Sequence, residues 1–195
     1  DNPYSEITYD YLAPSILQVP GAKDVAVEFN SLSKTYSLAG HRIGMVVGNP
    51  QIVEALGRIK TNIDSGIYGA VQDLAVAALS GDQSWIPARN EIYRRRRDKV
   101  VAVLNEIGVK ANVPRAGLYV WGHVPEGFTS ANFTDMLLLR SGIAVTSGAS
   151  YGAQGEGYFR MALTVPDDEV DKAVERLRGL DLSVKAEAQP AGIGK

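Results

Sequence analysis

Lys34 stands in a stretch whose residue types and spacing could carry chemistry, since residues 31–44 read SLSKTYSLAGHRIG. A partly buried lysine amine can be neutral at physiological pH and can then form a Schiff base with an aldehyde. Ser31, Ser33 and Arg42 add hydroxyl and guanidinium donors, which suit an anionic ligand. From spacing alone, a strand end followed by a polar loop with an incidental lysine is an equally good interpretation.

A second group of polar residues opens the chain, where residues 1–10 read DNPYSEITYD. Asp1 offers a carboxylate, and Tyr4 offers a phenol three residues later. Asp-Asn-Pro-Tyr is a common turn sequence, and taken alone the turn is the better interpretation. Its place about 30 residues ahead of Lys34 makes it a functional signal only together with that lysine.

A third candidate is Arg160, in the middle of residues 155–164, which read GEGYFRMALT. The alternation in this run predicts a strand with few charges. A guanidinium inside such a strand is costly unless it is paired. A substrate carboxylate would be a natural partner because arginine binds carboxylates through two parallel hydrogen bonds. A carboxylate of the protein itself is the alternative, and without the other two groups we would favour it.

In this order, the three groups resemble the signatures of the class I and II aminotransferases, which are fold-type I enzymes that depend on pyridoxal 5′-phosphate (PLP). The resemblance covers nearly the whole chain. It implies that Lys34 holds PLP as a Schiff base and moves the proton during catalysis. It also implies that Asp1 pairs with the pyridine nitrogen and that Tyr4 donates to the neighbouring ring oxygen.

The same resemblance assigns the remaining candidates. Ser31, Ser33 and Arg42 match positions that hold the phosphate of PLP, and Arg160 matches the arginine that binds the α-carboxylate of an amino-acid substrate. The substrates implied are an amino acid and a 2-oxo acid. Family members are usually homodimers, so the resemblance also implies a homodimer, and it implies a cytoplasmic enzyme.

The resemblance implies an α/β fold in two parts. Residues 1–82 are expected to form the C-terminal part of the PLP-binding large domain, a mixed sheet flanked by helices. Residues 83–180 are expected to form the smaller α+β C-terminal domain with its long connecting helix, and residues 181–195 a mobile tail. We also expect a preceding N-terminal segment, because the aromatic residue and the glycine-rich helix start that the family uses around PLP are not in this sequence.

Hydrophobic periodicity and turn residues predict the elements along the chain. The expected strands are 25–29, 43–48, 118–124, 143–146 and the run around Arg160, and the expected helices are 51–63, 68–79, 84–107, 131–141 and 167–177. Asn49 and Pro50 are expected to start the first of these helices. Trp121 is expected in the core and His123 on a half-buried strand.

Composition narrows the possible classes of protein. The 195 residues are 45% hydrophobic and 22% charged, with a net charge of -2 and no cysteine. These values are typical of a globular chain, give no reason to expect binding to nucleic acid or membranes, and exclude disulfides and thiolate metal sites. No apolar run approaches the ~20 residues of a membrane span. With only His41 and His123, we expect no metal site.

The densest charge run, residues 94–97, reads RRRR and could be interpreted as a nucleic-acid patch. Four consecutive helical residues point in different directions, and Glu91 and Asp98 lie alongside. A solvated helix with salt bridges is therefore the better interpretation.

Within the family, the quoted runs are most similar to those of bacterial LL-diaminopimelate aminotransferases, which implies exchange between LL-2,6-diaminopimelate and 2-oxoglutarate in lysine biosynthesis. Aspartate or alanine aminotransferase stays open, because the side-chain pocket in these enzymes is built largely outside this segment. A PLP-dependent β-lyase is a further enzyme alternative. The non-enzyme alternatives are an aminotransferase-like sensing domain of a transcription regulator and a folded fragment without catalysis of its own.

Overall fold

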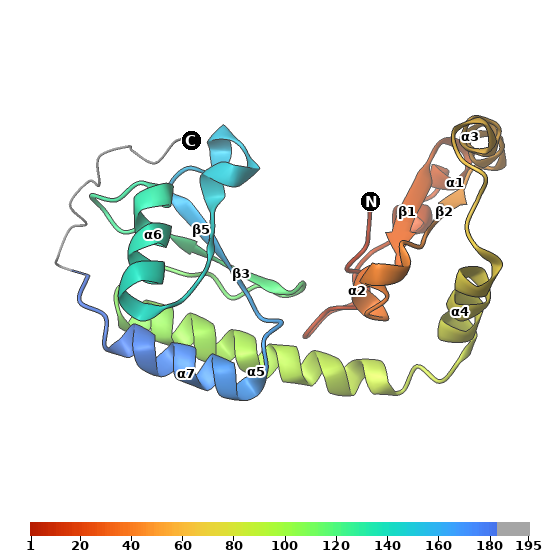
Figure 1. Ribbon diagram of the computed structural model, residues 1–195. Coiled ribbons are helices and arrows are strands. Elements are labelled where there is room, and N and C mark those ends of the chain that lie inside the picture. Colours follow the sequence, from red (N-terminus) through yellow and green to blue (C-terminus); the bar gives the residue numbers. More distant parts are fainter. Residues whose placement is uncertain (183–195) are drawn as a thin grey trace. The chain divides into compact units, whose positions relative to one another are not determined.

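The structure, a computed structural model, describes residues 1–182 (Figure 1). The chain divides into two compact units. The first combines Asp1–Asn90 with Arg115–Gly117, and the second combines Glu91–Pro114 with the chain from Leu118 onward. The expected tail, 181–195, lies outside the described residues from 183 onward. The domain boundaries expected from the sequence remain a prediction.

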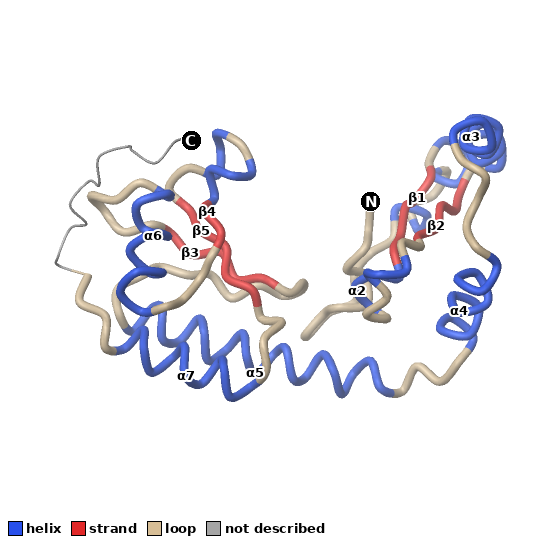
Figure 2. Tube along the Cα trace, in the orientation of Figure 1, coloured by secondary structure: helices blue, strands red, loops and turns tan. Residues whose placement is uncertain are grey.

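Both units mix helices with strands, as Figure 2 shows, and the expected α/β class is confirmed. In the first unit, β1 (Val27–Ser31) pairs antiparallel with β2 (Gly44–Gly48), in register from Val27↔Gly48 to Ser31↔Gly44. Within the described residues, this pair is the part of the expected mixed sheet that is present. The residues of β2 are half-buried or exposed.

Short and long helices complete the first unit. They are η1 (Ile16–Gln18), α1 (Ala22–Val25), α2 (Leu32–Thr35), η2 (Ala39–His41), α3 (Pro50–Ile63) and α4 (Gly69–Ser80). A small core joins α2, α4 and the residue before β2 through the buried side chains of Leu32, Ala75 and Ile43. This core attaches the end of β1 and the turn that follows it to the rest of the unit.

The start of α3 follows the expectation from the sequence. Asn49 Oδ1 accepts a hydrogen bond from the Ile52 N–H at 3.0 Å, which satisfies one unpaired donor of the first turn. Pro50 occupies the first turn, where its missing N–H has no role in the helix. Asn49 Nδ2 also donates to the Asp24 carbonyl at 2.7 Å, so this side chain joins α3 to the end of α1.

We expect Asn49→Ala to lower the free energy of unfolding by about 1–2 kcal/mol, because it removes the helix cap and the bond to Asp24. Urea titration followed by circular dichroism measures the change. Gln51→Ala, at an exposed position of the same turn, is the control and should change stability by less than about 0.5 kcal/mol. Equal stability of the two variants would contradict the capping role.

α5 (Trp85–Glu106) contains residues of both units, with its first turns in the first unit and the rest in the second. The run 94–97 lies in the second unit. Arg94 pairs with Glu91 at 2.7 Å near the surface, as the solvated-helix interpretation expects. That interpretation is wrong for Arg97, which is 6% exposed and donates to the Pro114 carbonyl at 2.9 Å. The helix turns by about 100° per residue, so one member of the run faces inward.

The second unit is built on an antiparallel sheet of order β3-β5-β4. Its strands are β3 (Tyr119–His123), β4 (Thr146–Ser147) and β5 (Tyr158–Ala162). Its other elements are α6 (Ser130–Ser141), η3 (Gly148–Tyr151), η4 (Ala153–Gly155) and α7 (Asp167–Arg178). The predicted strand 143–146 is wrong over most of its length, because only the two residues of β4 reach β5.

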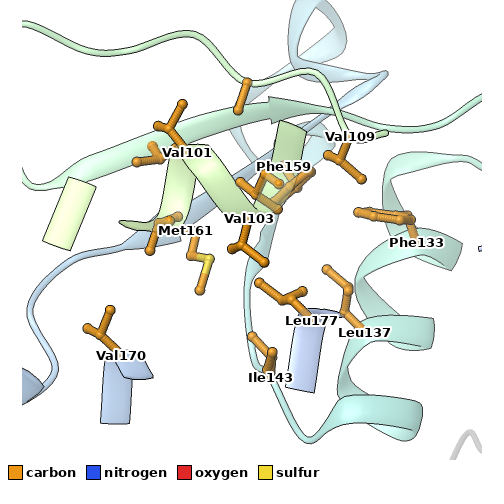
Figure 3. Close-up of a cluster of buried hydrophobic side chains, with 14 of the residues drawn as sticks. Val101, Val103, Val109, Phe133, Leu137, Ile143, Phe159, Met161, Val170 and Leu177 are labelled. Atoms are coloured by element: carbon orange, nitrogen blue, oxygen red, sulfur yellow. The ribbon is translucent and has the colours of Figure 1, made fainter. Parts of the chain in front are cut away.

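One face of this sheet is buried and the other is open. Val120, Phe159 and Met161 belong to a core that α5, α6 and α7 complete. Figure 3 shows Phe159 and Met161 within this core. Gly122 belongs to the same buried face, where a Cβ would lie 2.5 Å from ring atoms of Phe159, so glycine makes room for that ring. Because side chains alternate along a strand, Arg160 points to the opposite, open face.

The turn before β5 is held by a carboxylate. The Ser130 N–H donates to Glu156 Oε1 at 2.8 Å, and Ser130 Oγ accepts from the Gly157 N–H at 2.8 Å. Ser130 is fully buried, so these bonds join the start of α6 to the turn that leads into the Arg160 strand. The Ser130 backbone donor holds the pKa of Glu156 below its usual value.

This lowered pKa predicts how stability depends on pH. A group with a lower pKa in the folded state stabilises the fold above its unfolded pKa and loses that contribution as the pH falls through the folded pKa. We therefore expect Glu156→Gln to lower the melting temperature at pH 7, with the difference from wild type shrinking below about pH 4.5. Calorimetry across pH 3–7 measures it, with Glu126→Gln, at an exposed carboxylate, as control. A difference that does not depend on pH would refute the linkage.

Candidate functional site

Lys34 lies in α2, the single helical turn that follows β1. Ser31 begins this turn, with its Oγ accepting from the Ser33 N–H at 3.2 Å. Leu32 and Thr35 are each 2% exposed and anchor the turn, while Lys34 is half-buried. Within residues 1–182, the Lys34 amine has no hydrogen-bond or ion-pair partner. The structure therefore holds the backbone of this lysine firmly and leaves its amine available.

Ser31, Ser33 and Arg42, predicted together from the sequence, lie together in the structure. They line one open hollow of about 150 Å³ with Ile43 and Gly44. Ser31 Oγ donates to Ser33 Oγ at 2.9 Å. A Cβ at Gly44 would lie 2.8 Å from the Asn30 carbonyl, so glycine allows β2 to approach β1 at this corner.

Arg42 reaches this hollow through an unusual backbone conformation. Its φ is 54°, in the left-handed region that non-glycine residues rarely adopt. Its Nη1 donates to the Ala39 carbonyl at 2.9 Å, while the residue as a whole is exposed. Hydroxyls and a permanently charged guanidinium around one hollow form a donor set that fits a phosphate group.

Asp1 and Tyr4 belong to the same unit as Lys34. Their segment runs beside β1, because the Asn2 N–H donates to the Phe29 carbonyl at 2.7 Å. Ile7, which is fully buried, anchors the other end of the segment. Asp1 is exposed and Tyr4 is half-buried.

Arg160 lies in the second unit, at the centre of β5, opposite Trp121 on β3 and Thr146 on β4. Its guanidinium carbon lies 4.0 Å from the ring centroid of Tyr119 and 4.7 Å from that of Tyr151. No carboxylate of the described residues forms an ion pair with it. Within the described residues, its neighbours are therefore aromatic rings and not the protein carboxylate that the sequence left open as an alternative. The edge of the guanidinium keeps its donors for a ligand.

The aromatic residues beside Arg160 correct one expectation. Trp121 was expected in the core but is 39% exposed, with its ring 5.4 Å from that of Tyr151. It lies on the open face because it is paired with Arg160 across the sheet. His123 is half-buried on β3, as expected.

Several residues around Lys34 had no signal in the sequence. Arg89 and Asn90, in α5, donate to the backbone near Lys34 and near Tyr4. Tyr36 donates to Gln83 Oε1 at 2.9 Å, and burial raises the pKa of its phenol. In the sequence these residues are ordinary members of a helix and a turn, because their partners, backbone carbonyls for Arg89 and Asn90 and a side-chain amide for Tyr36, lie far away along the chain.

No group of three or more histidine, aspartate or glutamate side chains among the described residues is arranged to hold a metal ion. None of the helices formed by residues 1–182 combines the length and the apolar character needed to cross a membrane.

Comparison with known proteins places this geometry in context. Residues 1–177 match the model of the family described as "Aminotransferase class I and II". An LL-diaminopimelate aminotransferase of Dehalococcoides mccartyi is 51% identical over 180 residues, which are 92% of this chain and 46% of that protein. Another, of Moorella thermoacetica, is 50% identical over 179 residues, covering 91% of this chain and 46% of that protein.

The chain is also similar to solved structures of aminotransferases. A probable N-succinyldiaminopimelate aminotransferase of Thermus thermophilus has a TM-score of 0.85 and 36% identity, over 91% of this chain and 48% of that one. The chain thus spans about half the length of the curated relatives it matches.

Proposed function

The chain belongs to the class I and II aminotransferase family, and from this premise we propose that it carries the catalytic lysine and part of the cofactor and substrate sites of a PLP-dependent aminotransferase. Members of this family depend on PLP and exchange amino groups between amino acids and 2-oxo acids. The observation that supports the proposal best is the Lys34 amine, which has no partner among the described residues. Lys34 comes directly after Ser33, which lines the hollow with Ser31 and Arg42.

The donor chemistry of the first unit fits PLP. Lys34 would hold the cofactor, and Ser31, Ser33 and Arg42 would hold its phosphate. Asp1 would pair with the pyridine nitrogen and Tyr4 would donate to the ring oxygen. When bound, PLP supplies the electron sink for the negative charge that develops on the substrate. Lys34, released by the incoming amino acid, would move the proton at the substrate α-carbon as base and then as acid.

Arg160 would bind the substrate α-carboxylate through the edge of its guanidinium. Tyr119 and Tyr151 support this role because they cover its faces and restrict its orientation. Binding of a carboxylate at this edge would form two parallel charged hydrogen bonds, which fix the orientation of the substrate as well as its affinity.

For the substrates we propose LL-2,6-diaminopimelate and 2-oxoglutarate, and hence a role in lysine biosynthesis. The support is the identity of 50–51% to two proteins named LL-diaminopimelate aminotransferase. Activity with aspartate or alanine is the alternative within the family. The proposal includes an N-terminal segment that completes the site, a homodimer and a cytoplasmic location.

Borohydride trapping tests the proposal. The 195-residue chain and the full-length protein are each incubated with PLP, reduced, digested and analysed by mass spectrometry. We expect a pyridoxyl group confined to the peptide that contains Lys34. Label spread over exposed lysines such as Lys23, or no label in the folded full-length protein, would refute the proposal.

Product assays then decide the reaction. LL-diaminopimelate, aspartate and alanine are each supplied with and without 2-oxoglutarate, and the amino and oxo products are measured. The proposal expects the fastest turnover with LL-diaminopimelate and none without an acceptor. Turnover of a sulfur amino acid without an acceptor would instead indicate a β-lyase. A protein that binds PLP without turning over any of these would favour a sensing domain.

A further inference from the structure

Arg89, in the second turn of α5, contacts two separate backbone segments of the first unit. Its Nη1 donates to the carbonyl of Thr35, and its Nη2 donates to the carbonyl of Glu6 at 3.1 Å. Thr35 is the last residue of α2 and directly follows Lys34. Glu6 lies in the segment that carries Asp1 and Tyr4. One guanidinium therefore connects the backbone beside the lysine to the backbone beside the other proposed cofactor residues.

The side chains around Arg89 hold it in this orientation. Asn90 Oδ1 accepts from Arg89 Nη2 at 2.9 Å, and Asn90 Nδ2 donates to the same Glu6 carbonyl at 2.8 Å. The guanidinium carbon of Arg89 lies 5.0 Å from the ring centroid of Trp85, one turn earlier in α5. These contacts fix the plane of the guanidinium and leave it little freedom to reach other acceptors.

The need for such a connection follows from the length of α2. A helix of four residues is too short to be stable alone. Its first turn fixes the backbone of several residues, and the hydrogen bonds of a single turn do not offset that loss of conformational entropy. Its last carbonyls have no partners within the helix, and a cation at this end also interacts favourably with the helix dipole. Arg89 supplies both a donor and a positive charge there. A lysine could supply the charge, but its single ammonium lacks the planar fork that reaches two carbonyls at once.

We propose that Arg89 is a positioning residue for Lys34, which sets the place of the lysine turn relative to the segment of Asp1 and Tyr4. The inference rests on the proposed function, since the geometry matters only if Lys34 holds the cofactor. Arg89 acts through backbone carbonyls and touches neither substrate nor cofactor in this role. Its loss should therefore weaken the capture of PLP by Lys34 more than it weakens the fold.

The test compares Arg89→Gln and Arg89→Lys with Arg97→Gln in the full-length protein. Arg97 makes a similar bond from α5 to a backbone carbonyl, that of Pro114, but in the second unit. Two quantities are measured for each variant: the PLP concentration that half-saturates borohydride-trapped labelling of Lys34, and the melting temperature without PLP. Labelling is measured at a temperature at which every variant is folded by circular dichroism.

We expect both Arg89 variants to raise the half-saturating PLP concentration about tenfold or more. Arg97→Gln should lower the melting temperature and leave labelling close to wild type. If Arg89→Lys is half-saturated at the same PLP concentration as wild type, the planar guanidinium is not needed and its proposed role is overturned. Half-saturation that rises in Arg97→Gln as much as in Arg89→Gln would show a general effect of stability and overturn the inference. If wild type labels at Lys34 while the Arg89 variants match it, only the inference fails. If wild type itself does not label, the proposed function fails with it.

Discussion

Lys34→Ala is expected to abolish both the PLP label and transamination, with turnover falling by at least about 10⁴-fold. The reason is that one amine has two tasks: it holds the cofactor, and it then moves the proton at the substrate α-carbon. Among the described residues, no lysine lines the hollow of Ser31, Ser33 and Arg42, so no amine there can replace that of Lys34. Single-turnover absorbance measurements of the full-length protein with an amino acid would give the rate.

Two variants serve as controls for Lys34→Ala. Lys34→Arg keeps a positive charge and much of the volume, but its guanidinium stays protonated and can neither hold the cofactor nor move the proton. It should therefore be as inactive as the alanine variant. Lys23→Ala, at an exposed position in α1, should leave turnover and labelling unchanged. A Lys34→Ala protein that retains activity within about tenfold of wild type would remove Lys34 from the catalytic role.

Arg160→Gln is expected to raise KM for the amino acid about 100-fold or more, because it removes two charged hydrogen bonds to the substrate carboxylate. Labelling of Lys34 by PLP should not change, since the arginine is proposed to bind substrate and not cofactor. Steady-state kinetics together with borohydride trapping separate the two effects. An intact KM in a variant that still folds would indicate that another group binds the carboxylate.

The conservative variant tests the geometry at the same position. Arg160→Lys keeps a positive charge between Tyr119 and Tyr151 but loses the two parallel donors, so its KM should lie between wild type and Arg160→Gln. Arg95→Gln removes an exposed arginine of α5 and should leave KM unchanged. Equal KM values for Arg160→Lys and wild type would show that charge alone is sufficient.

Local chemistry in the sequence was enough to predict much of the fold. Asn49 and Pro50 begin α3 as expected, because a cap acts on N–H groups within three residues of itself. Gly142 ends α6 with a φ of 67°, a conformation that glycine adopts without strain. The grouping of Ser31, Ser33 and Arg42 was predicted from residue types and from the family resemblance, and the antiparallel pairing of β1 with β2 brings the three residues to one hollow.

Features that depend on distant partners were not predictable in this way. The strand expected at 143–146 is reduced to Thr146–Ser147, since a strand extends only as far as its neighbour pairs with it. Trp121 is exposed because its face of the sheet is set by the register with β5, and hydrophobicity alone indicated the core.

The sequence by itself determined the family of the chain, the residues proposed to contact cofactor and substrate, and most helix positions. These features depend on residue types and on short spacings along the chain, and neither depends on the tertiary structure. Only the tertiary structure decided that Arg97 is buried, that aromatic rings flank Arg160, and that Arg89 connects the Lys34 turn to the segment of Tyr4. Each of these is a contact with a backbone or ring far along the chain. Such a contact exists only once folding has brought the two partners together.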